Sequence, residues 1–284
     1  TEKGRCYWMR VFEIPEGTKQ SKGRAIQNMI NIEQDDKVIT YIHVEDLKDE
    51  EYVKNNFITM VTKKGVIKKT TLESYSRPRS NGIIAVNIRE EDELLEAKLT
   101  DGNSYILMAL RSGRAIRFHE EKVRSMGRTA SGVRGVTLAH DKDEVVGMIC
   151  VSGGEDSDET VMVVSEKGYG KRTDIEDYRI TNRGGKGVKT MNITDKTGEL
   201  IAIKNVSDLD DLMIINKKGI TIRLALESVR VMGRATQGVR LINMKATDEI
   251  AAVAKVPHSD EEEEEDVTDV NENGTENAPE GGED

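Results

Sequence analysis

Arginine and lysine residues gather around glycines in several separate stretches of the sequence, and the stretch ITNRGGKGVKT at 180–190 is the densest. Such side chains supply positive charge, and glycines allow a phosphate to approach main-chain N–H groups closely. The pattern therefore favours the binding of a polyanion. The residues predicted to make these contacts are Arg179, Arg183, Gly184, Gly185, Lys186, Gly187, Lys189, Arg124, Arg128, Arg134, Lys19, Lys22, Arg24, Arg77, Arg79, Arg230, Arg234 and Arg240.

No catalytic grouping competes with this prediction. The sequence has no Ser-His-Asp or Cys-His grouping at a nucleophile-type turn and no GxxxxGK[ST] phosphate loop. Cys6 and Cys150 are too far apart for a disulfide framework or a metal site, and the histidines form no ligand spacing. Acidic residues cluster in stretches such as EQDDK and REEDE, where they most simply form turns. We therefore expect two reduced thiols and no catalytic residue, metal or cofactor in this chain.

The basic stretches recur because the sequence contains a repeat. In five segments an apolar run and a polar pair lead to a first glycine, and these are Gly4, Gly65, Gly113, Gly168 and Gly219. A second glycine follows 17 or 19 residues later in each segment, at Gly23, Gly82, Gly132, Gly187 and Gly238. We expect the first glycine in a tight hairpin turn, where a positive φ is needed.

Each repeat continues with an alternating stretch, an acidic turn and another apolar run, as in VKTMNI, TDKTGE and LIAIKNV. Period-two alternation broken by Gly and Asp indicates strands, and helical periodicity is nearly absent. Four short strands in about 50 residues, repeated, predict an all-β fold of the propeller-like class. The repeats span 1–50, 51–102, 103–155, 156–208 and 209–257. Because the first repeat opens in its hairpin turn without a leading strand, we expect it to be incomplete and the chain to be a fragment.

Charge is distributed unevenly along the chain. The formal net charge is −10, but 13 of the 52 acidic residues fall in 259–284, which holds no Lys or Arg, so the remaining chain carries a net charge of +3. We expect residues 258–284 to form a disordered acidic tail, because such a composition cannot offset its ordering entropy. No apolar run is long enough to span a bilayer, and no signal-peptide pattern is present, so a cytoplasmic location is expected.

The cations also recur in register within the repeats. Besides the loops near the second glycine, Lys69, Arg117, Arg172 and Arg223 each lie four residues after a first glycine. If the repeats are blades, these positions recur around one rim, where a polyanion such as duplex DNA would bind without sequence readout. Pairing of the same cations with nearby acids is the simpler alternative. The aromatic residues Trp8, Tyr75 and Tyr178 are expected to pack within the fold rather than to stack on bases.

Stretches such as KGRAIQNMINIEQDDKVITYI, VRSMGRTASGVRG, GYGKRTDIEDY and VMGRATQGVRL give residues 1–257 a specific resemblance. The chain resembles the C-terminal domain of the A subunit of bacterial DNA gyrase, a type IIA topoisomerase. The resemblance implies a six-bladed β-pinwheel whose neighbouring blades exchange strands and whose basic rim wraps duplex DNA. It also implies partners, namely the B subunit and the rest of the A subunit in an A2B2 holoenzyme. ATP and Mg would act elsewhere in that holoenzyme, which would introduce negative supercoils on the nucleoid.

Two departures from the family pattern limit this prediction. The hallmark box Q-R-R-G-G-[KR]-G belongs to the first blade, whereas the match here, TNRGGKG at 181–187, lies in the fourth visible repeat. The catalytic tyrosine lies in another domain of the family, so this chain alone is not expected to cleave DNA. The C-terminal domain of the topoisomerase IV A subunit and a propeller that binds other proteins stay open as alternatives.

Overall fold

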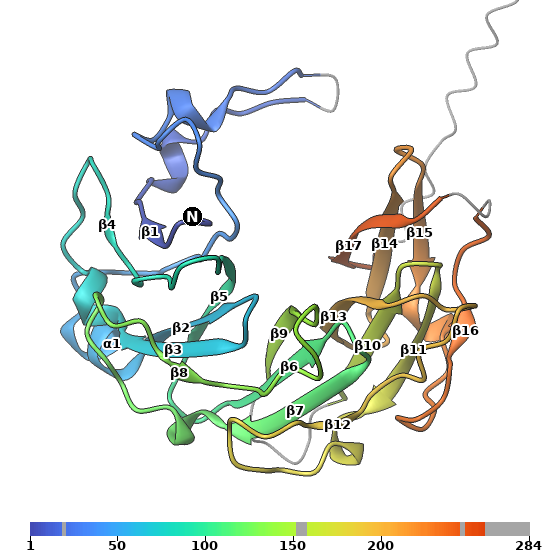
Figure 1. The fold of residues 1–284 in the computed structure, drawn as a ribbon. Coiled ribbons are helices and arrows are strands. Elements are labelled where there is room, and N and C mark those ends of the chain that lie inside the picture. Colours follow the sequence, from blue (N-terminus) through green and yellow to red (C-terminus); the bar gives the residue numbers. More distant parts are fainter. Residues whose placement is uncertain (19–20, 152–157, 245–247, 259–284) are drawn as a thin grey trace, which may run out of the picture.

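Five antiparallel sheets follow one another around an arc (Figure 1) in a computed structural model that describes residues 1–18, 21–151, 158–244 and 248–258. The first sheet pairs β1 (Arg5–Cys6) with β4 (Ile83–Ile84). The second contains, in spatial order, β5 (Leu94–Thr100), β2 (Phe57–Thr62), β3 (Val66–Thr71) and β8 (Val133–Arg134). The third contains β9 (Val145–Val151), β6 (Tyr105–Leu110), β7 (Arg114–His119) and β12 (Val188–Lys189). The fourth contains β13 (Leu200–Val206), β10 (Thr160–Ser165), β11 (Tyr169–Asp174) and β16 (Val239–Arg240), and the fifth contains β17 (Ile250–Pro257), β14 (Asp210–Asn216) and β15 (Thr221–Ala225). Each sheet is one blade, so the all-β, propeller-like prediction is confirmed.

Neighbouring blades are joined by strand exchange. The outermost strand of the second blade, β8, lies in the third repeat of the sequence, and β12 and β16 are supplied to their blades in the same way by the following repeat. Each exchanged strand is only two residues long, and it extends a hairpin formed by longer strands of the preceding repeat. Each of the first four repeats therefore takes a strand from its successor, β4 pairing with β1 in the first, whereas all three described strands of the fifth sheet come from the fifth repeat.

The tight turns form at the predicted glycines. Gly4, Gly65, Gly113, Gly168 and Gly219 have φ angles between +79° and +85°, a region that residues with a side chain rarely enter. In the second blade the Gly65 N–H donates to the carbonyl of Thr62 at 3.0 Å, which closes the turn between β2 and β3. The side chain of Asp92 accepts from the Lys64 N–H at 2.9 Å, so the acidic turn supports this hairpin, as expected for a turn-forming residue.

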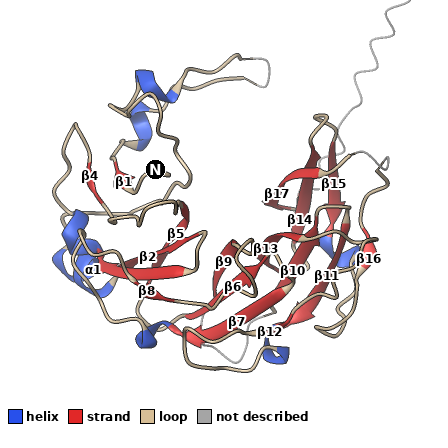
Figure 2. Cartoon of the chain, viewed as in Figure 1, coloured by secondary structure: helices blue, strands red, loops and turns tan. Residues whose placement is uncertain are grey.

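Helices are few and short (Figure 2). The one α-helix among the described residues is α1 (Glu50–Asn55). Asp49 caps its N-terminus, because the Asp49 carboxylate accepts from the N–H groups of Glu51 and Tyr52. The 3₁₀ turns are η1 (Val11–Glu13), η2 (Ile26–Asn28), η3 (Leu72–Tyr75), η4 (Glu120–Lys122), η5 (Ile175–Asp177) and η6 (Leu226–Ser228). The last four each follow the second long strand of a blade and begin the loop that leads to an exchanged strand.

The core lies between consecutive blades. One buried cluster joins Val61 and Ile67 of the second blade to Ile106, Met108 and Ile116 of the third. Among the innermost strands, β9 contacts both β5 and β13, and the exchanged strands β8, β12 and β16 lie on the outer edge of the arc.

The aromatic residues pack as predicted. The side chains of Tyr75 and Tyr178 are buried, and Trp8 packs against the cluster of the first two blades. Among the described residues, no helix is long and apolar enough to cross a membrane.

Candidate nucleic-acid interface

Three loops with the same arrangement of cations lie along the outer edge of the arc (Figure 1), and we call them the basic loops. They comprise residues 120–134, 175–189 and 226–240, and each ends in an exchanged strand. Counted from the second glycine of its repeat, each carries a cation eight residues before, four residues before and two residues after. The nine residues are Arg124, Arg128 and Arg134, then Arg179, Arg183 and Lys189, then Arg230, Arg234 and Arg240. The first and third members of each set are exposed and the middle members are half-buried.

The middle arginines connect one basic loop to the next. Arg183 donates to the carbonyl of Lys122 at 2.9 Å and to that of Arg134 at 3.0 Å. Arg234 donates to the carbonyl of Lys189 at 2.8 Å. At each boundary between loops, the guanidinium of one loop therefore binds the main chain at the last cation of the loop before it, Arg183 at Arg134 and Arg234 at Lys189.

The nine cations form no ion pair with the acids of the described residues. Within the ranges that the structure describes, no carboxylate oxygen lies within 4.0 Å of a side-chain nitrogen of any of the nine. Placing like charges side by side without counter-ions raises the local potential and favours an external anion. The basic loops thus form a continuous cationic edge.

Two buried lysines hold the basic loops in place, and the sequence reasoning did not single them out. Lys171 donates to the carbonyl of Gly233 at 2.6 Å and to that of Arg234, and Lys68 donates to the carbonyls of Ala85, at 2.6 Å, and Arg128. Burial lowers the pKa of both lysines to about 8. The signal available in the sequence was position, because both follow a first glycine by three residues and lie within a strand where an apolar residue is usual.

The glycines of the 180–190 stretch serve the packing between blades. A Cβ on Gly187 would lie 2.3 Å from the carbonyl oxygen of Ala115, and φ at Gly187 is +68°. The Gly184 N–H donates to the carbonyl of Gly135 at 2.6 Å. The expectation that this N–H would face a phosphate is therefore wrong at Gly184, whereas Gly185 and Lys186 are exposed.

The strand cations behave differently from the loop cations. Lys69, Arg117 and Arg172 are buried, and they pair with Glu120 at 3.6 Å, Glu176 at 3.0 Å and Asp208 at 2.5 Å, respectively. Arg223 pairs with Asp211 at 2.6 Å. For Lys69, Arg117 and Arg172 the predicted place on a rim stripe is wrong, because these side chains are buried and bind acids or carbonyls of the next repeat.

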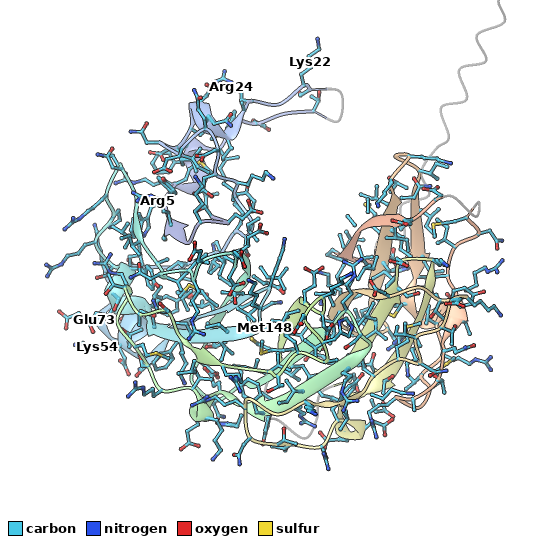
Figure 3. All side chains as sticks on the ribbon, viewed as in Figure 1. Arg5, Lys22, Arg24, Lys54, Glu73 and Met148 are labelled. Carbon is cyan, nitrogen blue, oxygen red and sulfur yellow. The ribbon has the colours of Figure 1, made fainter. Side chains whose placement is uncertain are left out.

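The remaining predicted contacts lie apart from the basic loops. Arg77 and Arg79 are exposed after η3, where the repeat lacks the regular cation spacing. Lys22 and Arg24 lie on a segment that projects from the first blade (Figure 3), and Lys19 lies outside the described residues, as does the tail from 259.

Other chemistry is not apparent in the described part of the chain. Cys6 and Cys150 are free, as expected, and burial raises the pKa of their thiols to about 11 and about 12. Among the described residues, no group of three or more His, Cys, Asp or Glu side chains is arranged to hold a metal.

Comparison with known proteins agrees with this architecture. The model of the DNA gyrase C-terminal domain, a β-propeller, matches residues 1–42, 56–101, 104–152, 159–207 and 210–257. The chain is 45% identical over 277 residues to the DNA gyrase A subunit of Staphylococcus aureus strain MRSA252, covering 97% of this chain and 30% of that protein. It is 44% identical over 280 residues to the A subunit of strain NCTC 8325, of which it covers 31%. The chain thus spans less than a third of the length of these relatives.

Solved structures show the same fold. The C-terminal domain of DNA topoisomerase IV aligns with a TM-score of 0.79 at 23% identity, covering 90% of this chain and 77% of that one. The DNA gyrase A C-terminal domain aligns with a TM-score of 0.74 at 22% identity, covering 89% and 80%. The family model matches most of the chain, segment by segment in the order of the repeats. This chain therefore belongs to the DNA gyrase C-terminal domain family of β-propellers.

Proposed function

We propose that this chain binds duplex DNA along the basic loops and bends it around the outer edge of the arc. The observation that carries the proposal is the set of nine loop cations, which recur at the same three positions in three successive repeats and have no carboxylate partner among the described residues. DNA presents phosphates at regular intervals, and neutralising several of them releases counter-ions without reading the base sequence. A curved cationic edge matches a curved duplex.

In a longer protein the chain acts as the C-terminal part of the DNA gyrase A subunit. The identity of 45% to such a protein over nearly the whole chain supports this role. We propose that bending by this domain presents DNA to the rest of an A2B2 holoenzyme, which supercoils it negatively with ATP and Mg bound elsewhere. The chain by itself supplies binding and no cleavage, in the cytoplasm and on the nucleoid.

Two alternatives make different predictions. The A subunit of topoisomerase IV would also bind DNA, and the C-terminal domain of that enzyme has the same fold. Relatives that are 44% and 45% identical to this chain, however, are gyrase A subunits. A propeller that binds other proteins would need an apolar or mixed binding face, whereas the outer edge here is cationic.

A linking-number assay tests the proposal. The chain is bound to a nicked plasmid, the nick is ligated, the protein is removed and the topoisomers are separated on a gel. A shift of linking number that grows with protein concentration supports bending with a defined hand. Binding without a shift would refute wrapping with a defined hand.

A salt series on a linear duplex tests the binding itself. If about six phosphates are neutralised at once, the logarithm of the binding constant should fall with the logarithm of salt concentration with a slope of about −5. An affinity that does not change with salt would refute the proposed interface.

A further inference from the structure

An exposed apolar side chain occupies the same position in two of the three basic loops. Ile180 and Val231 each lie seven residues before the second glycine of their repeat, directly after the first cation of the loop, Arg179 and Arg230 respectively. Ile180 is 53% exposed and Val231 is 42% exposed. The first basic loop has Ser125 at this position, and this residue is exposed as well. The cationic edge therefore carries apolar surface at a recurring place beside its cations.

Hydrogen bonds fix the main chain on both sides of Ile180. Two residues before it, Tyr178 is buried, and the Tyr178 carbonyl accepts from the guanidinium of Arg117 at 3.3 Å. On the other side, the Thr181 N–H donates to the main-chain carbonyl of Arg117 at 2.9 Å. The exposed residues 179 and 180 thus lie between two points that one buried arginine holds.

The other two basic loops repeat the second of these bonds. Directly after Val231, the Met232 N–H donates to the main-chain carbonyl of Arg172 at 2.9 Å, and the Met126 N–H donates to that of Lys69 at 2.8 Å. Isoleucine and valine have few χ1 rotamers because they branch at Cβ. The apolar side chains at this position therefore present a preorganised surface, which loses little conformational freedom when it binds a partner.

The neighbouring cations determine which partner fits this surface. Each of the two apolar residues lies in the sequence between the first and the middle cation of its loop. A partner that covers the apolar side chain must therefore also carry negative charge beside its own apolar surface. Duplex DNA has this character, because phosphates alternate with deoxyribose carbons along each strand. Where DNA bends around a protein, its minor groove faces the protein once in each turn, and sugars line that groove.

We propose that Ile180 and Val231 pack against deoxyribose carbons of the minor groove when DNA lies on the basic loops. This contact rests on the proposed function, because the same loops hold the DNA, and it adds an apolar contribution that charge alone does not supply. Phosphate contacts hold the duplex at the edge, and the two side chains set how closely the groove approaches the main chain. Like a phosphate contact, a sugar contact reads no base sequence.

Ile180→Ser and Val231→Ser, made together, test the contact by titration of a labelled duplex over a range of salt concentrations. Serine is the residue that the chain has at position 125, so the main chain should keep its conformation. Because no charge is removed, the dependence of the binding constant on salt should stay that of the original chain. The affinity should fall about tenfold at every salt concentration if about 55 Å² of apolar surface is buried, at about 25 cal/mol per Å².

A reverse change and a matched control accompany the double serine variant. Ser125→Val adds an apolar side chain to the first basic loop and should strengthen binding about threefold, again without a change in salt dependence. The control, Leu209→Ser with Ile220→Ser, removes side chains that are 81% and 56% exposed and lie in the turns before β14 and β15. These turns are outside the basic loops, so the control should bind DNA as tightly as the original chain. A loss in the control equal to that of the double serine variant would refute the contact.

Duplex RNA separates a sugar contact from other effects, because the sugars of its minor groove carry 2′-hydroxyl groups. The double serine variant should bind duplex RNA about as tightly as the original chain does. An equal loss of affinity for DNA and for RNA would overturn the contact with deoxyribose.

Failure of this contact is distinguishable from failure of the proposed function. If the original chain binds DNA with a strong salt dependence and the double serine variant binds equally tightly, the apolar contact is refuted and the proposed function stands. If the affinity of the original chain does not change with salt, the proposed function is refuted and the apolar contact with it.

Discussion

Neutralising one cation in each basic loop should remove a defined part of the DNA affinity. The third member of each set is the best choice, because Arg134, Lys189 and Arg240 are exposed and lie in β8, β12 and β16. The main chains of these strands stay paired whatever the side chain, so Arg134→Gln, Lys189→Gln and Arg240→Gln together should leave the fold intact.

The magnitude follows from counter-ion release. Each phosphate contact contributes about 0.9 to the slope of the logarithm of the binding constant against the logarithm of salt concentration, so three lost contacts should reduce the slope by about 2.7. Between 1 M and 0.1 M salt each contact is then worth about eightfold, and the triple variant should bind about 500-fold more weakly at 0.1 M. The two binding curves should converge near 1 M. Titration of a labelled duplex at five salt concentrations measures both quantities.

A second triple variant controls for net charge. Lys54 lies in α1 (Figure 3), and Lys64 and Lys217 lie in hairpin turns at first glycines, so all three are exposed cations outside the basic loops. Changing these three to Gln alters the net charge equally and should leave the slope nearly unchanged. If this control loses as much slope as the basic-loop variant, the binding is a property of overall charge and the proposed interface is wrong.

Three further predictions concern the parts that hold the basic loops. The pKa of Lys171 is about 8 in the folded chain, and its ordinary value is 10.5. Between pH 8 and 10.5 the folded chain therefore binds fewer protons than the unfolded chain, so the free energy of unfolding should rise with pH in this range. Lys171→Met should remove its share of that rise in denaturant titrations, and an identical pH dependence in both proteins would contradict it. Gly187→Ala should destabilise the chain by about 2 kcal/mol more than Gly219→Ala. Both glycines have positive φ, but a Cβ at Gly187 would lie 2.3 Å from a carbonyl oxygen, whereas nothing lies within 4 Å of a Cβ at Gly219. Equal losses of stability would exclude the clash. Arg172→Met should cost about 2–4 kcal/mol of stability, since Arg172 is buried and bonded to Thr160, Leu226 and Asp208. The dependence of DNA binding on salt concentration should stay unchanged. A weaker salt dependence would place Arg172 in the interface.

The repeat made most of the fold predictable. The hairpin turns at glycines such as Gly65 and Gly113 depend on residues that are adjacent in the sequence. The alternation of apolar and polar residues marks the strands on either side of each turn. Strand exchange entered only through the family resemblance. Nothing local to Val188 and Lys189 indicates that they pair with β7 of the preceding repeat, because that pairing depends on how whole blades dock.

The candidate interface was only partly predictable. The loop cations were found because their spacing repeats, but the same repetition made Arg117 and Arg172 look like surface residues. Their burial depends on acids that lie far away in the sequence, such as Glu176, 59 positions from Arg117. Similarly, Lys68 and Lys171 hold the basic loops through main-chain carbonyls of the next repeat, those of Arg128 and Gly233, and spacing within a single repeat carries no information about these bonds.

Strand exchange also explains why the cationic edge is continuous. Arg183 donates to the carbonyl of Arg134, which belongs to the exchanged strand of the preceding repeat, and Arg234 makes the same kind of bond to Lys189. The bonds that join one basic loop to the next are therefore also bonds between repeats. A change that loosens one blade boundary should separate two cations and weaken DNA binding at that boundary, even where no contact to DNA is altered. For boundary variants such as Gly187→Ala, stability and DNA affinity should fall together. Substitution of an exposed cation of the basic loops should lower DNA affinity and leave stability unchanged.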